Sequence, residues 1–244
     1  TAHVKALEER LGAALFERQA RGVRLTALGL AAVEELTGAF DALAGAEARL
    51  RALALPREVH IATLPAIAQL WLSPRLPALR AAAPEISVSI TALEAPPNLK
   101  RSLHDLSLFP GTSGGRLVAE DALFPVCSPA LAARLRQVED LAGVPCLSDT
   151  AWDRDWEVWL AAEGAKVAVR GPVFSLYALA VEEAVNGAGV LMGHGPLVAG
   201  HLERGALVAP FPQRVGLASG FRLWSARPME RGGAVERVAA FLAA

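Results

Sequence analysis

A stretch of nearly thirty residues without proline divides this chain into two unlike parts. From Ala27 to Leu55 there is neither a proline nor a cluster of loop-forming residues, and Pro56 follows at once. Because Thr26 is a residue type that caps helix N-termini, the sequence predicts one long helix over 27–55. A helix of this length cannot be covered by the short segment before it, so we expect it to pair with a copy of itself in a homodimer. Its apolar positions include Leu30, Val33, Leu36, Phe40, Leu43, Leu50 and Leu53.

The residues before this helix predict a short helix and a small two-stranded wing. Apolar residues within 4–11 are spaced as one helix face, and Gly12 is suited to end that helix. Two strand-like pieces, 15–18 and 23–25, flank a basic turn. Since the pattern is already helical at the first residue, we expect residues upstream of Thr1 to be missing from this sequence.

After Pro56 the pattern changes to alternating strands and helices, which predicts an α/β fold. Residues 58–62 and 87–91 read as strands around a helix over 66–82, a βαβ unit. Further strands are predicted at 105–109, 122–127, 167–170, 189–192, 206–209 and 221–225, and further helices at 130–136, 152–163, 176–186 and 234–242.

Charge and cysteine content exclude several classes of protein. Lys plus Arg is 24 and Asp plus Glu is 25, so the net charge of −1 gives no overall attraction to nucleic acid or anionic lipid. Any DNA affinity must come from a local patch. Cys127 and Cys146 are too few for a disulfide framework. There is no signal peptide pattern and no apolar run long enough to span a membrane, so we expect a cytoplasmic protein without a membrane partner.

The sequence offers no catalytic, cofactor-binding or metal-binding motif. The five histidines lack the paired spacing of a zinc site, and Gly187 with Gly189 is too weak for a dinucleotide fingerprint. Three tryptophans at helical spacing predict a packed face, and the acids among them suit a helix N-terminus. These residues are Trp152, Trp156, Trp159, Asp153, Asp155 and Glu157. We therefore expect no enzyme activity, no cofactor and no metal.

Residues 4–18 (VKALEERLGAALFER) and 22–29 (GVRLTALG) resemble the most characteristic segment of LysR-type transcriptional regulators. The resemblance implies that 1–26 is the C-terminal part of a winged helix-turn-helix domain and that 27–55 is a linker helix. It also implies that 56–244 is a two-lobed effector-binding domain similar to periplasmic binding proteins. Lobe 1 would comprise about 57–122 and 227–244, and lobe 2 about 123–226.

Four further segments are similar to one branch of this family. They are Ser148-Asp149, 152–156, 171–175 and 179–181. The branch includes glycine-cleavage activators and β-lactamase regulators.

The predicted partner of the N-terminal part is double-stranded DNA. Residues at the rear of a recognition helix can reach the DNA, and arginines on a wing can hold phosphates or enter the minor groove. Solvated surface charge is the alternative reading of each residue. The candidates are Thr1, His3 and Lys5 on the helix and Arg18, Arg21 and Arg24 on the wing.

A two-lobed fold binds its ligand between the lobes, where strands end and helix N-termini offer free N–H groups. We expect a small anionic or zwitterionic effector there. For Thr63 and Ser128, helix capping is an equal alternative to ligand contact. The candidate effector residues are Thr63, Leu64, Pro65, Ala66, Phe109, Pro110, Gly111, Thr112, Ser128, Phe174, Ser175, Met192, Gly193 and His194.

These features predict a sequence-specific DNA-binding transcriptional regulator controlled by a small effector. Similar proteins imply a homodimer through the linker helix that assembles further into a homotetramer. Two alternatives remain. A solute-binding protein shares the two-lobed fold but needs an export signal where residues 1–55 stand, and a regulator of this fold can also act without an effector.

Overall fold

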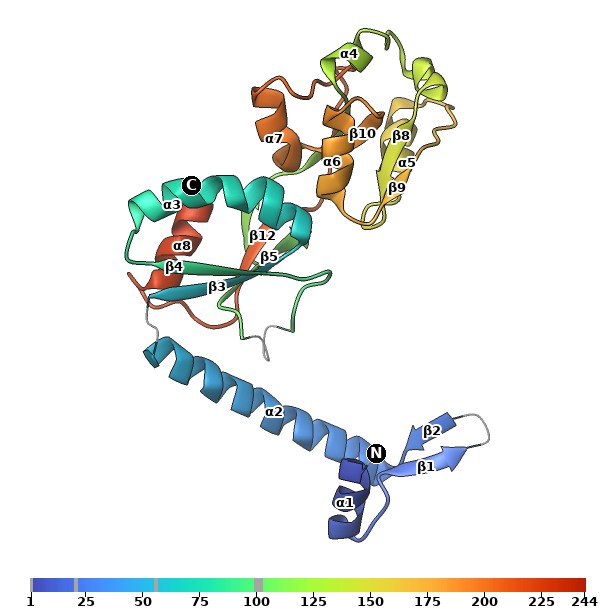
Figure 1. Cartoon of the computed structure of the whole chain (residues 1–244). Coiled ribbons are helices and arrows are strands. Elements are labelled where there is room, and N and C mark those ends of the chain that lie inside the picture. Colours follow the sequence, from blue (N-terminus) through green and yellow to red (C-terminus); the bar gives the residue numbers. More distant parts are fainter. Residues whose placement is uncertain (1, 20–21, 55–56, 99–102) are drawn as a thin grey trace. The chain divides into compact units, whose positions relative to one another are not determined.

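The computed structural model describes residues 2–19, 22–54, 57–98 and 103–244. The chain divides into two compact units, residues 1–56 with 98–103 and residues 57–97 with 104–244. Figure 1 colours the helices and wing of the first unit blue and runs from teal to red through the second.

The first unit opens with the predicted helix and wing. Helix α1 (Ala2–Leu11) ends at Gly12, whose φ of +65° is the left-handed conformation that glycine adopts most readily. Strands β1 (Phe16–Gln19) and β2 (Gly22–Leu25) then pair antiparallel. The predicted order of short helix and wing is therefore confirmed.

Thr26 caps helix α2 (Ala27–Ala54), as the sequence predicted. Its Oγ1 accepts a hydrogen bond from the Gly29 N–H at 2.9 Å and donates one to the Ala14 carbonyl at 2.9 Å. A Cβ at Gly29 would lie 2.1 Å from the Leu15 carbonyl oxygen, so only glycine fits at this contact. The cap and the glycine together join the start of α2 to the loop before the wing.

Helix α2 leaves a row of large apolar side chains exposed to solvent. At 28 residues it is about 42 Å long at the standard rise per residue. A row of this kind is unusual on a monomeric surface and typical of a pairing face. The exposed apolar residues on α2 are Leu28, Leu30, Val33, Leu36, Phe40, Leu43 and Leu50.

Lobe 1 of the second unit is a five-stranded sheet in the order β4-β3-β5-β12-β6. Strand β3 runs parallel to β4 and β5, whereas β12 is antiparallel to both β5 and β6. Helix α8 (Ala234–Leu242) packs against β3. The strands are β3 (Glu58–Thr63), β4 (Ser87–Ala92), β5 (Leu106–Gly111), β6 (Arg116–Ala119) and β12 (Gly220–Ser225).

The single helix predicted over 66–82 is a run of three different helices. A π-helix, η1 (Ile67–Leu72), is followed by a 3-10 turn, η2 (Ser73–Arg75), and by α3 (Leu76–Ala82). Pro74 and Pro77 lie within this run and cannot donate the hydrogen bonds that a continuous α-helix requires. The prolines therefore account for the change of helix type.

Lobe 2 is a second five-stranded sheet, in the order β11-β7-β10-β8-β9. Strand β10 is antiparallel to β7 and parallel to β8, which in turn is parallel to β9. The strands are β7 (Ala122–Val126), β8 (Cys146–Asp149), β9 (Val173–Phe174), β10 (Val190–His194) and β11 (Val215–Gly216). The helical segments are α4 (Pro129–Ala132), η3 (Val138–Gly143), α5 (Asp155–Glu163), α6 (Tyr177–Val185) and α7 (Gly195–Glu203).

The chain crosses between the lobes twice, and the second crossing comes earlier than predicted. The first crossover follows β6 at about 119–122, where the sequence placed it. The second lies at 216–220, because β12 pairs with β5 of lobe 1 from Gly220↔Gly111 to Ser225↔Leu106. Lobe 2 therefore ends before β12, and the predicted boundary at 226 is wrong.

Two other predicted strands are absent. Residues 167–170 have no strand assignment, and the chain forms β9 a few residues later instead. Residues 206–209 contribute only an isolated bridge between Val208 and Cys127. Both segments are apolar because they pack on a hydrophobic core. Val167 and Val169 pack against one core cluster, whereas Leu207 and Ala209 belong to the other.

The tryptophans behave largely as a packed face. Trp156 and Trp159 are buried on α5 in the core of lobe 2, as predicted. Trp152 lies before α5 rather than on it, and its ring centroid is 5.1 Å from that of Tyr177. The predicted helix therefore begins three residues later than expected.

Candidate functional site

The predicted effector loops leave the two sheets at edges that adjoin the crossovers. In lobe 1, β3 and β5 run parallel with Thr63 opposite Leu108, so loops 63–66 and 109–112 emerge at the same edge. This edge meets the second crossover, since Gly111 pairs with Gly220. The carboxyl ends of parallel strands are where open α/β sheets bind ligands.

The matching edge of lobe 2 carries Asp149, Phe174 and His194. Strands β8 and β9 end side by side with Asp149 opposite Phe174. Strand β10, parallel to β8, ends at His194, which is opposite Leu123 just after the first crossover. We call the region beside the crossovers, where these strand-end loops of both lobes emerge, the candidate cleft.

Half of the predicted effector residues are accessible in this arrangement. Ala66, Phe109, Met192 and Gly193 are buried and contribute packing rather than side chains that a ligand can reach. The accessible or partly accessible members are Leu64, Pro65, Pro110, Gly111, Thr112, Phe174 and Ser175.

The hydroxyl of Thr63 binds a neighbouring strand of its own sheet. It is fully buried and donates a 2.6 Å hydrogen bond to the Leu108 carbonyl oxygen. No side-chain hydrogen bond caps the following helix η1. Thr63 therefore neither caps the helix nor offers a free hydroxyl group to a ligand.

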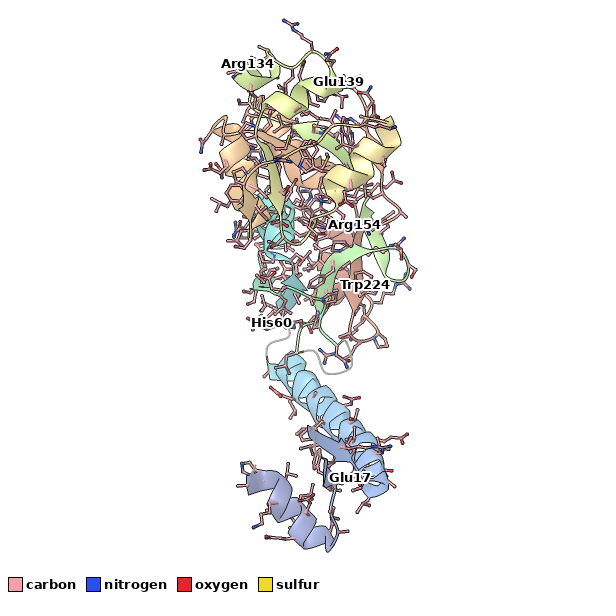
Figure 2. The ribbon with its side chains drawn as sticks, turned by 90° about the vertical axis from the view of Figure 1, so that its right-hand side faces the viewer. Glu17, His60, Arg134, Glu139, Arg154 and Trp224 are labelled. Carbon is pink, nitrogen blue, oxygen red and sulfur yellow. The ribbon has the colours of Figure 1, made fainter. Side chains whose placement is uncertain are left out.

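Ser128 follows the end of β7 that is remote from the crossovers, so it does not lie at the candidate cleft. Strand β7 starts beside the first crossover at Ala122 and runs away from it, so Ser128 emerges next to the start of β10. Its Oγ is near Gly187 in the loop before β10, and it makes no capping hydrogen bond to α4. Figure 1 shows α4 at the end of lobe 2 remote from lobe 1, and Figure 2 places Arg134 at that end and Trp224 in lobe 1. The sequence placed Ser128 in the cleft because both edges carry helix-opening loops.

His194 is held in a buried network of charges. Its Nδ1 lies 2.6 Å from Oδ2 of Asp121 on the first crossover, and its Nε2 lies 2.9 Å from Oδ2 of Asp155 at the start of α5. The histidine is 1% exposed. With both ring nitrogens bonded, it has no free ring donor for an effector, contrary to the role that the sequence suggested.

The network keeps His194 positively charged. Burial disfavours the imidazolium, but the hydrogen bonds and charges of Asp121 and Asp155 outweigh it and raise the pKa of His194 to about 9. Both ring nitrogens then act as donors. Tyr177 completes the site, because its hydroxyl donates to the Met192 carbonyl oxygen and accepts the His194 backbone N–H, each at 3.0 Å.

Sequence reasoning missed the acidic partners in this network. Asp155 was assigned to the helix dipole, and Asp121 was not singled out. Asp149, the last residue of β8, is buried, and burial raises the pKa of its carboxyl group. Its position at a strand end beside the crossovers was the available signal, but β8 itself was not predicted.

The candidate DNA-binding residues lie in the first unit. His3 and Lys5 are exposed on α1, with Lys5 Nζ 3.8 Å from Glu9 Oε1, and Arg24 is exposed on the wing opposite Glu17. Figure 2 labels Glu17 on this wing. Thr1, Arg21 and the side chain of Arg18 lie outside the described residues.

Within the described ranges, no three His, Cys, Asp or Glu side chains are grouped so that they could hold a metal ion. Both cysteines are buried, and burial raises the pKa of Cys127 to about 11 and that of Cys146 to about 12. No helix in the part of the chain that the structure describes is both long and apolar enough to cross a membrane.

A winged segment, a long exposed helix and a two-lobed α/β domain define a DNA-binding regulator with a ligand-binding domain. Residues 1–30 match the family described as bacterial regulatory helix-turn-helix protein, lysR family, and residues 54–244 match the LysR substrate binding domain. The chain belongs to the LysR family of transcriptional regulators, as the sequence predicted.

Curated relatives support the same assignment. The chain is 32% identical to the glycine cleavage system transcriptional activator of Escherichia coli (strain K12) over 219 residues, which cover 85% of this chain and 71% of the relative. It is 31% identical over 232 residues to the HTH-type transcriptional activator AmpR of Rhodobacter capsulatus, covering 92% of this chain and 80% of the relative. A glycine cleavage activator is a member of the branch predicted from the sequence.

Solved structures share the fold. The AmpR effector binding domain from Citrobacter freundii gives a TM-score of 0.65 at 20% identity, over 77% of this chain and 96% of that chain. CrgA, a LysR-type transcriptional regulator from Neisseria meningitidis, gives a TM-score of 0.60 at 21% identity, over 98% of this chain and 86% of that chain.

Proposed function

We propose that a small anionic or zwitterionic effector binds where the strand-end loops of the two lobes meet, and that it thereby controls DNA binding by this regulator. The observation that carries the proposal is the convergence of both sheet edges on the crossovers. A ligand that contacts both edges favours one arrangement of the lobes by its difference in affinity for the two arrangements.

The accessible loop residues favour a polar ligand of modest size. Ser175 presents an exposed hydroxyl beside the partly buried ring of Phe174, and loop 109–112 supplies backbone groups on the opposite lobe. Asp149 lies at the same edge of lobe 2 as Phe174, but its side chain is buried and accepts a hydrogen bond from the Ala151 N–H, so it is not among the proposed ligand contacts. A carboxylate on the effector would accept hydrogen bonds from the Ser175 hydroxyl and from backbone N–H groups of loop 109–112.

Pairing through α2 forms the second part of the proposal. Its exposed apolar row is suited to a homodimer in which two wings contact DNA phosphates through Arg24 and neighbouring cations. Further association of effector-binding domains would give a homotetramer. We also propose that the protein acts in the cytoplasm, where its DNA is, and as a regulator rather than an enzyme, in keeping with the regulatory names of its relatives.

The test is a thermal-shift screen of the full chain with the twenty common amino acids and simple carboxylates. An effector should raise the unfolding temperature of the wild type, and Ser175→Ala should weaken this response. Ser87→Ala is the matched control, because Ser87 is exposed at the opposite edge of lobe 1, at the start of β4. If no compound shifts the transition while promoter DNA is still bound, the regulator works without an effector of this class.

A further inference from the structure

A cavity of about 420 Å³ lies between the two lobes, apart from the candidate cleft. It is bounded by η1 and Arg75 of lobe 1, by both crossovers, and by the start of α7. None of the predicted effector residues lines it. Helix α7 of lobe 2 packs against η1 of lobe 1.

Two arginines are held over aromatic rings in this cavity. The guanidinium carbon of Arg75 lies 4.2 Å from the ring centroid of Trp71, and that of Arg214 lies 3.7 Å from the ring centroid of Phe124. Both rings are buried and therefore fixed in place. A guanidinium placed over a ring keeps N–H groups on its edge available for a carboxylate.

Neither guanidinium has a carboxylate within ion-pair distance among the residues that the structure describes. Arg75 donates one hydrogen bond to the Trp71 carbonyl oxygen at 2.7 Å. Partial burial lowers the pKa of Arg75, although the charge of Glu203 opposes this shift. A bound anion would stabilise the positive charges of Arg75 and Arg214.

The rest of the lining is compatible with negative charge. The cavity includes Gly195 at the N-terminus of the nine-residue helix α7, where the helix dipole favours an anion. Of the two acidic residues in the lining, Asp121 is paired with His194 through Oδ2 while its buried Oδ1 has no hydrogen-bond partner among the described residues, and Glu120 is exposed to solvent.

We propose that this cavity binds a small dicarboxylate, with one carboxylate on Arg75 of lobe 1 and the other on Arg214 beside the second crossover. A guanidinium on each side matches two carboxylates because each can form a forked pair of hydrogen bonds. Such a ligand bridges the lobes through residues other than the predicted effector residues. Its binding therefore depends on the arrangement of the lobes and forms a second input to the regulator.

Succinate is the probe for this site, titrated calorimetrically into the full chain in a buffer free of carboxylates and phosphate. We expect saturable binding to one site per chain. Arg75→Gln and Arg214→Gln should each raise the dissociation constant at least about tenfold, because each removes a forked ion pair. Arg80→Gln is the matched control, since Arg80 is an exposed arginine nearby on α3 that does not line the cavity.

Butyrate tests the need for two carboxylates and should bind at least about tenfold more weakly than succinate. Arg214→Lys keeps the charge but loses the forked geometry, so it reports on the site even if Arg214→Gln does not fold. Absence of saturable binding overturns the proposal, and so does succinate binding that both glutamine variants leave unchanged. Ser175→Ala should leave the succinate affinity unchanged, so this result is independent of the effector proposed for the cleft.

Discussion

His194 Nδ1 lies 2.6 Å from Asp121 Oδ2, and this contact joins the last residue of β10 to the first crossover. Asp155 binds the other ring nitrogen, so the imidazolium connects three segments that are distant in the sequence. The side chains of His194 and Asp121 are 1% and 4% exposed. The charge of each is therefore compensated inside the protein rather than by water.

Removing the imidazolium should strongly destabilise the second unit. His194→Gln leaves the buried Asp121 and the partly buried Asp155 without their cation, and a broken buried ion pair costs about 3–5 kcal/mol. Urea unfolding would measure the loss. His201→Gln is the control, because His201 is only 3.7 Å from the exposed Glu182 and its loss should cost about 1 kcal/mol or less. Equal losses in the two variants would contradict the role of the network.

The same network predicts a loss of stability in alkaline solution. Because the pKa of His194 is raised from 6.5 to about 9 in the folded protein, its contribution is complete below pH 6.5 and disappears as pH rises through about 9. The shift corresponds to about 3 kcal/mol. The free energy of unfolding of wild type and His194→Gln, measured from pH 6 to pH 10, should converge as pH rises. Curves that stay parallel would refute the prediction.

Phe40 tests the pairing face of α2. Its side chain is 59% exposed, so Phe40→Asp should leave the fold of the chain intact while removing two aromatic contacts from a dimer. At about 1.5 kcal/mol or more for each ring, the dimer dissociation constant should rise roughly hundredfold. Sedimentation equilibrium would measure this dissociation constant. Glu34→Gln, a change at another exposed residue of α2, is the control. An unchanged dimer would place the interface elsewhere.

Arg24 tests contact with DNA. If its exposed guanidinium holds a phosphate, Arg24→Ala should weaken binding to specific and unrelated sequences alike. Because a dimer loses one phosphate contact on each wing, the magnitude of the slope of log K against log salt should fall by about 2. Fluorescence anisotropy over a range of salt concentrations measures both. Arg80→Ala, on the second unit, should leave the slope unchanged. A loss confined to one DNA sequence would instead indicate contact with a base.

Gly29 tests the junction between the wing and α2. A Cβ there would lie 2.1 Å from the Leu15 carbonyl oxygen, so Gly29→Ala should displace the cap of the helix and weaken DNA binding. Gly38→Ala is the matched control, because open space surrounds Gly38 within the same helix. That change should stabilise α2 by about 0.5–1 kcal/mol. Circular dichroism would separate the two effects.

Local signals in the sequence were sufficient for the first unit. Gly12, Thr26 and the proline-free stretch up to Pro56 each act on their own neighbours, so helix ends could be predicted without knowledge of the fold. In the second unit the βαβ start was also predicted. The apolar segments 167–170 and 206–209 were wrongly predicted as strands. A loop that packs on a core and a strand within a sheet are both rich in apolar residues, so composition does not distinguish them.

The sites depended on contacts between distant residues. His194 lies 73 residues from Asp121 and 39 from Asp155, and no spacing in the sequence indicates that they meet. Ser128 and Thr63 both precede helices, yet strand direction places them at opposite ends of their lobes relative to the crossovers. The direction in which each strand runs depends on the topology of its sheet. The pattern of predicted strands along the sequence does not determine that topology.

The position of β12 between β5 and β6 has a consequence for the nascent chain. On the ribosome, β3 to β6 emerge first, but the strand that joins β5 to β6 is synthesised about a hundred residues later. Every strand of lobe 2 is complete before that point. The inserted lobe 2 can therefore fold before the sheet of lobe 1 has received β12, the strand that connects β5 to the edge strand β6. Lobe 1, which flanks lobe 2 in the sequence, is completed last.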